Sequence, residues 1–141
     1  RGAGLISVGS FPSGEWIHRP GFDVDTGAIC LAVLRRDGFV SLDAEETEGM
    51  LLTKPLVWRG SSLWVNVSTQ EGDVRVEVLD ADGGLLREGL SLTRSMPVVR
   101  DGVRLPVIWQ GEPGLTDLHQ QTVRLRFVAR NAELYSFWTE Q

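Results

Sequence analysis

Four stretches of this chain alternate apolar and polar residues with a period of two. They span residues 63–68, 74–79, 103–110 and 123–130, and glycine, asparagine or aspartate turns lie between them. In a β-strand, a period of two puts alternate side chains on opposite faces, so that one face of each strand packs on a core. Short strands at regular intervals, separated by such turns, are typical of an all-β protein. We predict an antiparallel two-sheet β-sandwich of jelly-roll type.

The same alternation predicts the core and leaves little room for helix. We expect less than about 15% helix, with one stretch of at most two turns at 115–121. Trp109 shares the parity of the apolar residues before it and is therefore expected in the core. The other predicted core residues are Ala32, Leu34, Leu63, Val65, Val74, Val76, Val78, Val107, Leu125 and Phe127.

The stretch Gly27–Leu42 contains two apolar runs on either side of a short charged turn. An uncharged run bounded by turn residues is typical of a strand that is buried on both faces. Asp37-Gly38 suits a tight two-residue turn, because both residue types accept a positive φ. We therefore predict a hairpin at the centre of the sheet. Arg36 and Asp37 are then either a structural pair at the strand ends or a polar group that meets a ligand or a partner domain.

Length and composition indicate a soluble globular protein with a core of its own. The 27 residues up to Gly27 are rich in glycine and proline, and we predict an irregular N-terminal segment at 1–26 packed on a sandwich domain at 27–141. The single cysteine, Cys30, lies in an uncharged apolar run and is expected to be buried and unreactive. A net charge of −5 without a basic stripe argues against nucleic acid, and no apolar run suits a membrane.

Asp43, Glu45, Glu46 and Glu48 form an acidic stretch. It is either a solvated turn or a calcium site, since carboxylate oxygens are ligands that calcium prefers. The spacing matches no calcium-loop pattern, so we expect no cofactor and keep calcium as the alternative. Catalysis is not predicted either. Glycoside hydrolysis needs two facing carboxyl groups, whereas the acidic residues here occupy turns or strand faces, such as that of Glu77, that we expect to be exposed.

Tryptophan is the residue type that most favours a binding function. Five are present, and aromatic rings commonly stack on the apolar face of a sugar while polar side chains bind its hydroxyl groups. Trp64 alternates with core valines, so we expect its ring on the outer face, with Asn66 beside it as a hydroxyl-binding residue. Trp16 and His18, in the loop-rich N-terminal segment, form an alternative site. Structural packing is the other interpretation of each tryptophan.

A family resemblance adds to this interpretation. The string LRRDGFVSLDAEE, the TKPL segment, VEVLDADG and the pair VRLRF and NAELYSFW occur in this order. Over about residues 27–139 the chain resembles the C-terminal β-sandwich of bacterial proteins related to the invertase and levanase group of glycoside hydrolases. In those proteins the sandwich follows a five-bladed β-propeller, which holds the catalytic carboxylates. This chain has no propeller, so the resemblance implies an accessory module rather than an enzyme.

We therefore predict a non-catalytic carbohydrate-binding module that is part of a larger secreted protein, extracellular or periplasmic. Its expected partners are a neutral polysaccharide or oligosaccharide and the catalytic domain of the parent glycoside hydrolase. The alternative is a structural sandwich that stabilises a catalytic propeller without binding sugar. The two differ in their surfaces. A packing module exposes a broad apolar patch, whereas a binding module presents aromatic rings with polar groups around them.

Overall fold

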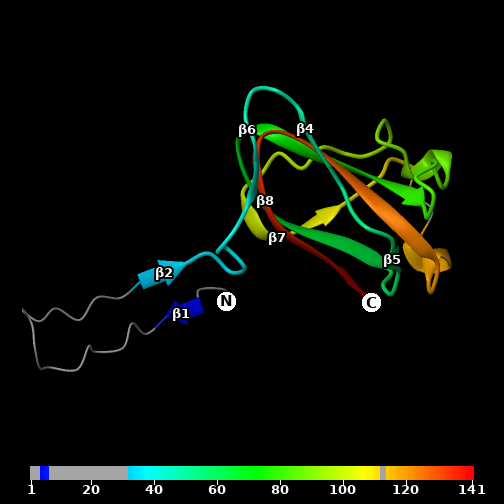
Figure 1. Cartoon of the computed structure of the whole chain (residues 1–141), viewed down its shortest axis with the longest axis horizontal. Coiled ribbons are helices and arrows are strands. Elements are labelled where there is room, and N and C mark those ends of the chain that lie inside the picture. The colour runs from blue at the N-terminus through cyan, green and yellow to red at the C-terminus, as the bar shows by residue number, and fades with distance from the viewer. Residues whose placement is uncertain (1–3, 7–31, 112–113) are drawn as a thin grey trace, which may run out of the picture. The chain divides into compact units, whose positions relative to one another are not determined.

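The computed structural model describes residues 4–6, 32–111 and 114–141 (Figure 1). Most of the described residues lie in antiparallel β-strands, which confirms the predicted all-β class. These ranges contain two short 3-10 helices and no α-helix. The chain divides into two compact units, residues 1–36 and 37–141. The boundary that we predicted, between residues 26 and 27, falls outside the described residues, as does Cys30.

In the first unit, strand β1 (Gly4–Ile6) pairs with β2 (Ala32–Leu34) in a two-stranded antiparallel sheet. The predicted hairpin at the centre of the main sheet is therefore wrong. The first apolar run pairs with β1 instead of with the second run, and the second run joins a strand only at Leu42. The predicted turn is present, because a turn spans residues 36–39 and Asp37 has a φ of 53°.

The second unit is a single curled antiparallel sheet of six strands. They are β3 (Leu42–Ala44), β4 (Gly49–Leu52), β5 (Leu56–Val57), β6 (Ser62–Asp80), β7 (Gly102–Val107) and β8 (Thr122–Glu140). The strand order is β3-β8-β6-β7, and β4 and β5 also pair with β8. Strand β8 thus pairs with β6 along one edge and with three short strands along the other.

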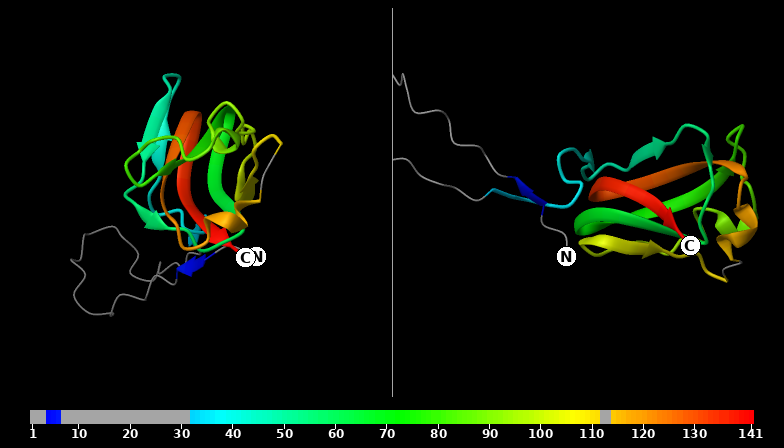
Figure 2. Two further views of the ribbon diagram at one scale, coloured as in Figure 1. Left: turned by 90° about the vertical axis from the view of Figure 1, so that its right-hand side faces the viewer. Right: turned by 90° about the horizontal axis from the view of Figure 1, so that it is seen from below.

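The two long strands bend together, and this bend gives the sheet its curl. Thr69 pairs with Ala132 and Asp73 pairs with Arg130, so three residues of β6 lie opposite Asn131 alone. Gly72 is one of the three, and a β-carbon there would overlap backbone carbonyl oxygens of β8. From the bend, both strands run back as two arms (Figures 1 and 2). We call residues 62–69 of β6 and 132–140 of β8 the first arm, and residues 73–80 and 122–130 the second.

The core lies between these two arms. Phe127 of the second arm and Phe137 of the first contact each other, with ring centres 5.0 Å apart. Trp109 is buried as predicted, and its indole N–H donates to the carbonyl oxygen of Val76 at 2.8 Å. Eight predicted core residues are confirmed as buried: Leu63, Val65, Val74, Val76, Val78, Val107, Leu125 and Phe127. Leu34 is half-buried, and the side chain of Ala32 lies outside the described residues.

Val103 departs from the predicted alternation, and the predicted helical stretch adds two leucines to the core. Val103 has core parity but is 37% exposed, because the register between β6 and β7 shifts so that Val67 lies opposite Gly102. The predicted helical stretch is confirmed as a 3-10 helix, η2 (Leu115–Leu118), whose two leucines are buried; the other, η1, spans Glu88–Leu90. The curled antiparallel sheet is what the structure establishes, and the sandwich and jelly-roll classes remain predictions.

Candidate functional site

Trp64 lies where the alternation placed it, on the outer face of the first arm. Its neighbours Leu63 and Val65 are fully buried, whereas Trp64 itself is only partly buried. Its indole N–H donates to the Ser62 hydroxyl at 3.0 Å. In the register of the sheet, Trp64 lies opposite Trp138 of β8 on one side and Pro106 of β7 on the other.

Asn66 does not have the exposure that we predicted for a hydroxyl-binding residue, because its side chain is fully buried. The reason is a β-bulge. The pairing of β6 with β8 shifts between Asn66 and Val67, and the pairing with β7 shifts at the same point. A bulge interrupts the inward and outward alternation of a strand, so three consecutive residues, Val65, Asn66 and Val67, are buried here. Asn66 is therefore not available to a ligand on the outer face.

Three other side chains complete the outer face around Trp64. The Arg104 guanidinium lies over the Trp64 ring, 4.5 Å from the ring centre, and forms an ion pair with Glu140 at 2.5 Å. The same carboxylate accepts a hydrogen bond from the indole N–H of Trp138 at 2.8 Å. We call Trp64, Trp138, Arg104 and Glu140 the tryptophan face. It comes from three neighbouring strands, β6, β8 and β7.

Aromatic rings and charged hydrogen-bonding groups lie side by side on this face. Indole rings provide large, rigid apolar surfaces, and a cation over a ring is held by the ring's quadrupole. Arg104 has five N–H donors and Glu140 has only acceptor sites, so the pair presents both halves of the hydrogen bonds that hydroxyl groups make. Arg104 also covers one side of the Trp64 ring. A ligand on this face would therefore stack on Trp138 or displace Arg104.

Of the remaining predicted site residues, Arg36 and Asp37 lie within the described part of the chain. The Asp37 carboxylate accepts a hydrogen bond from the Ser136 hydroxyl at 3.4 Å, and Ser136 lies two residues before Trp138 on β8. Asp37 is thus placed next to the tryptophan face, while Arg36 is exposed and belongs to the first unit. Trp16 and His18 lie outside the described residues.

Sequence reasoning missed Arg104 and Glu140 and left Trp138 undecided. Their relevance depends on strand order, because β7 and β8 are brought to β6 from far along the chain. The signal that was available is parity. Arg104 alternates with the core residue Leu105, and Trp138 lies beside the core-packed Phe137. Parity indicates that a side chain points outward, but it does not indicate which outward side chains become neighbours.

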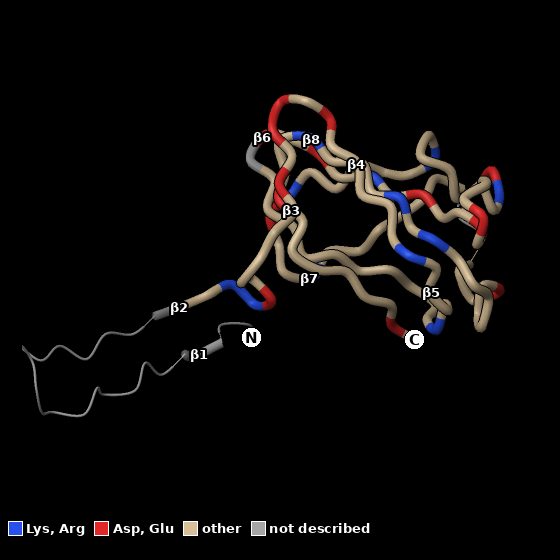
Figure 3. The backbone as a smooth tube through the Cα atoms, in the orientation of Figure 1, with Lys and Arg blue, Asp and Glu red and all other residues tan. Residues whose placement is uncertain are grey.

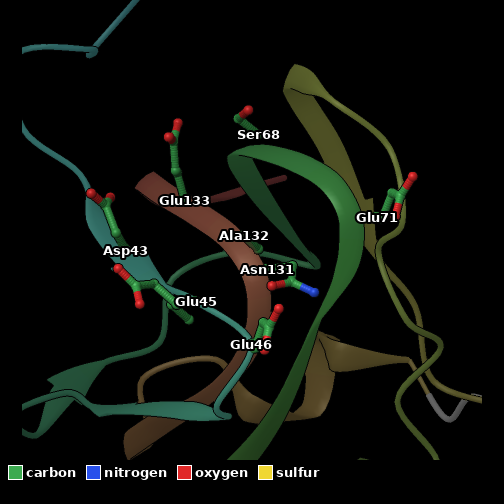
Figure 4. A pocket seen from close by; sticks show the side chains of 9 residues that line it. Asp43, Glu45, Glu46, Ser68, Glu71, Asn131, Ala132 and Glu133 are labelled. Atoms are coloured by element: carbon green, nitrogen blue, oxygen red, sulfur yellow. The ribbon is translucent and has the colours of Figure 1, made fainter.

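An acidic pocket lies at the bend (Figure 4). Its volume is about 600 Å³, and it is lined by Asp43, Ala44, Glu45, Glu46, Ser68, Glu71, Asn131, Ala132 and Glu133. Three of the four residues of the predicted acidic stretch are among them. Figure 4 shows the carboxylates spread around the pocket rather than turned toward one point. Within the described ranges, no three acidic, histidine or cysteine side chains come together as a metal site would require. The absence of a cofactor stays the prediction, with calcium as the alternative.

Comparisons with protein-family models, with curated proteins and with solved structures give no match for this chain. The function must therefore be argued from the residues and their arrangement. Across the described ranges, no helix has the length and apolar character needed to cross a bilayer.

Proposed function

We propose that this chain is a non-catalytic carbohydrate-binding module attached to a glycoside hydrolase, and that the tryptophan face binds a neutral poly- or oligosaccharide. The observation that supports the proposal is the pairing of Trp64 with Trp138 on adjacent strands, with Arg104 over the Trp64 ring and Glu140 bonded to the indole N–H of Trp138. A sugar offers an apolar ring face and many hydroxyl groups. The tryptophan face offers an indole surface for the first and charged donors and acceptors for the second.

Each of these side chains has a separate role in the proposed complex. Trp138 supplies the stacking ring, because Arg104 already covers one side of Trp64. Arg104 donates to hydroxyl oxygens and Glu140 accepts from hydroxyl hydrogens, while Asp37 extends the polar side of the face. Each hydrogen bond to the sugar replaces one to water, so we expect a dissociation constant of about 10 µM to 1 mM, or about 4–7 kcal/mol.

Replacement of either tryptophan is the direct test. Trp138→Ala should weaken binding at least about tenfold, since it removes a stacking ring worth at least about 1.4 kcal/mol, and Trp64→Ala should weaken it less, since it removes the ring that Arg104 covers. Binding is measured by a glycan array and by affinity electrophoresis on neutral polysaccharides. Trp138→Phe is the matched control and should retain most of the affinity, because it keeps a stacking ring.

Thermal unfolding of the same variants separates binding from folding. Trp64 and Trp138 are only partly buried, so both alanine variants should stay folded with small shifts in melting temperature. Unfolding of Trp64→Ala would mean that this ring is a core residue. If the wild-type chain binds no glycan in a broad screen, the carbohydrate proposal fails and the packing function described below replaces it.

The proposal includes a finer fold class and a location. Contact between Phe127 and Phe137 across the core supports the assignment of the two arms as the two sheets of a jelly-roll type sandwich. As a module of a glycoside hydrolase that acts on polysaccharide, the chain would work outside the cytoplasm, in the extracellular medium or the periplasm.

A second candidate function is favoured by exposed apolar side chains along one margin of the sheet. They precede or belong to the short strands on the free side of β8, and they are Phe39, Val40, Leu42, Met50, Leu52 and Val57. We call these six residues the apolar margin. Phe39, Val40 and Met50 are 77%, 74% and 70% exposed. Apolar surface of this kind marks an interaction site, so the module would pack against the catalytic propeller of the parent protein.

The apolar margin can be tested by a polar double variant. Phe39→Ser with Val40→Ser should lower the fluorescence of a bound hydrophobic dye by about twofold and reduce self-association at high concentration. Both side chains are exposed, so the melting temperature should change little. Ile108→Ser is the matched control, because Ile108 is also exposed, at 45%, but lies after β7. Equal effects of the two changes would contradict a specific role for the apolar margin.

A further inference from the structure

The second unit has two adjoining cavities. They lie between the turn that joins β5 to β6 and the segment that contains helix η2. Their volumes are about 590 and about 200 Å³, and both are lined by Arg59, His119 and Gln141. The remaining lining residues are Val57, Gly60, Ser61, Thr116 and Gln120. We call the two cavities together the Arg59–His119 cleft. No Asp or Glu side chain is among its lining residues, although the whole chain has a net charge of −5. Gln141, which lines both cavities, is the last residue of the 141-residue chain and carries its α-carboxylate.

One wall of the cleft is fixed by Trp58, which is fully buried. Its backbone N–H donates to the carbonyl oxygen of Gln121 at 2.9 Å, and its carbonyl oxygen accepts from the N–H of Gln120 at 2.8 Å. Its indole N–H donates to the carbonyl oxygen of Gly60 at 2.5 Å. Arg59 therefore lies between two residues that the structure holds in place, while its own side chain is exposed.

The opposite wall is fixed by helix η2. Leu115 and Leu118 are both buried in the core, and His119 follows Leu118 directly. Gln120 has a φ of 62°, which lies in the left-handed region that few residues other than glycine adopt. Such backbone strain occurs where the surrounding structure imposes it, and here the reciprocal hydrogen bonds with Trp58 do so. Two polar side chains thus face the cleft from an anchored segment.

Within the described part of the chain, the side chains of Arg59 and His119 form no ion pair or hydrogen bond. Among residues 4–6, 32–111 and 114–141, no carboxylate forms an ion pair with the Arg59 guanidinium, and no hydrogen bond of the His119 imidazole is present. Four other arginines of this unit, Arg75, Arg87, Arg104 and Arg126, each pair with a carboxylate side chain. An exposed guanidinium that faces a cavity lined by no Asp or Glu side chain is suited to bind an oxyanion, with two parallel N–H donors.

We propose that the Arg59–His119 cleft binds a small oxyanion group, a carboxylate or a sulfate, with Arg59 as the main contact and His119 and Gln120 as additional donors. This site is separate from the tryptophan face and does not depend on carbohydrate binding there. The group has two possible sources, an acidic or sulfated sugar unit and a free anion. The shared chemistry is a compact negative charge with several acceptor oxygens.

The test is a titration of the full 141-residue chain with glucuronate and, separately, with inorganic sulfate, followed by two-dimensional NMR of the backbone amides. We expect the amide signals of Arg59, His119 and Gln120 to move in a saturable way, with a dissociation constant of about 1–10 mM, as for a single charge-assisted site. Arg59→Ala should weaken binding at least about tenfold, and Arg59→Lys should have a smaller effect because the charge remains.

Arg94→Ala is the matched control, because Arg94 is also exposed but lies in the connection between β6 and β7, outside the cleft. This variant should bind as the wild type does. Binding of glucuronate alone would identify a sugar acid as the ligand class, and equal binding of both probes would identify any compact oxyanion; either result supports the proposal. If neither probe moves these signals at about 50 mM, or if Arg94→Ala weakens binding as much as Arg59→Ala, the proposal is overturned.

Discussion

The outer faces of the two arms differ, although β6 contributes to both with the same alternation. Trp64 in the first arm and Glu77 in the second both lie between fully buried residues and point away from the core. Trp64 remains partly exposed, as do Trp138 and Glu140 beside it, and Arg104 is exposed. Glu77 is only 4% exposed, which corrects our prediction that its strand face is open to solvent.

The two faces differ in exposure because the segment that connects β6 to β7 covers the second arm. It pairs with the free edge of the second arm, where Val98 lies opposite Val74 and Leu85 opposite Leu79. From this connection the backbone N–H of Leu92 donates to Glu77 Oε2 at 3.2 Å, and the other carboxylate oxygen forms an ion pair with Arg126. A buried charge is retained when it is paired in this way. Alternation therefore predicts the direction of a side chain but not whether another segment covers it.

Nearby charges on the second arm follow the same pattern of close pairing. Arg75 Nε lies 2.7 Å from Asp73 Oδ2, two residues away on the same strand. The hydrogen bond to Asp73, followed by its negative charge, raises the pKa of Arg75 above its ordinary value. Acidic residues gather instead around the bend and the loop before β4, as Figure 3 shows. The charged side chains on the outer face of the second arm thus pair with one another, whereas those of the tryptophan face are nearer to solvent.

The largest expected effect comes from breaking the bend that separates the two arms. In Gly72→Ala, the new methyl group would overlap carbonyl oxygens of Arg130 and Asn131, which are backbone atoms of β8. We expect a loss of about 3 kcal/mol in the free energy of unfolding, measured with urea. Gly83→Ala is the control. Its φ is 94° but nothing lies within 4 Å of the added atom, so we expect about 1 kcal/mol. Equal losses would mean that the bend tolerates a side chain.

A smaller loss of stability is expected when a carboxylate is removed from either of the two outer faces. Glu77→Ala leaves the N–H of Leu92 without its acceptor and Arg126 without its counter-ion. Arg126 is 36% exposed, so we expect about 2 kcal/mol rather than the larger cost of a fully buried pair. Glu140→Ala, on the tryptophan face, should cost only about 0–1 kcal/mol. Thermal and urea unfolding measure both, and a larger loss for Glu140→Ala would reverse our account of the two faces.

The sequence was sufficient to predict the β class and most of the core, because alternation depends only on neighbouring residues. Leu63, Val65 and Phe127 were predicted in this way and are buried. The partner of β2 could not be predicted, since an apolar run specifies a strand but not the strand it pairs with. Asn66 was misjudged because a bulge is a property of two strands in register. At the candidate site, Trp64 could be found from parity, whereas Arg104 required knowledge of strand order.

The position of β8 at the centre of the sheet has a consequence for the order in which the protein can fold. The short strands β3, β4 and β5 pair with β8, β6 pairs with it along one of its two edges, and all four precede it in the chain. During synthesis from the N-terminus, the three short strands and this edge of β6 therefore stay unpaired until residues 122–140 leave the ribosome. Pairing between distant segments is slow and exposes aggregation-prone edges meanwhile. The short, interrupted strands β3, β4 and β5 offer little edge for another chain to join during that delay.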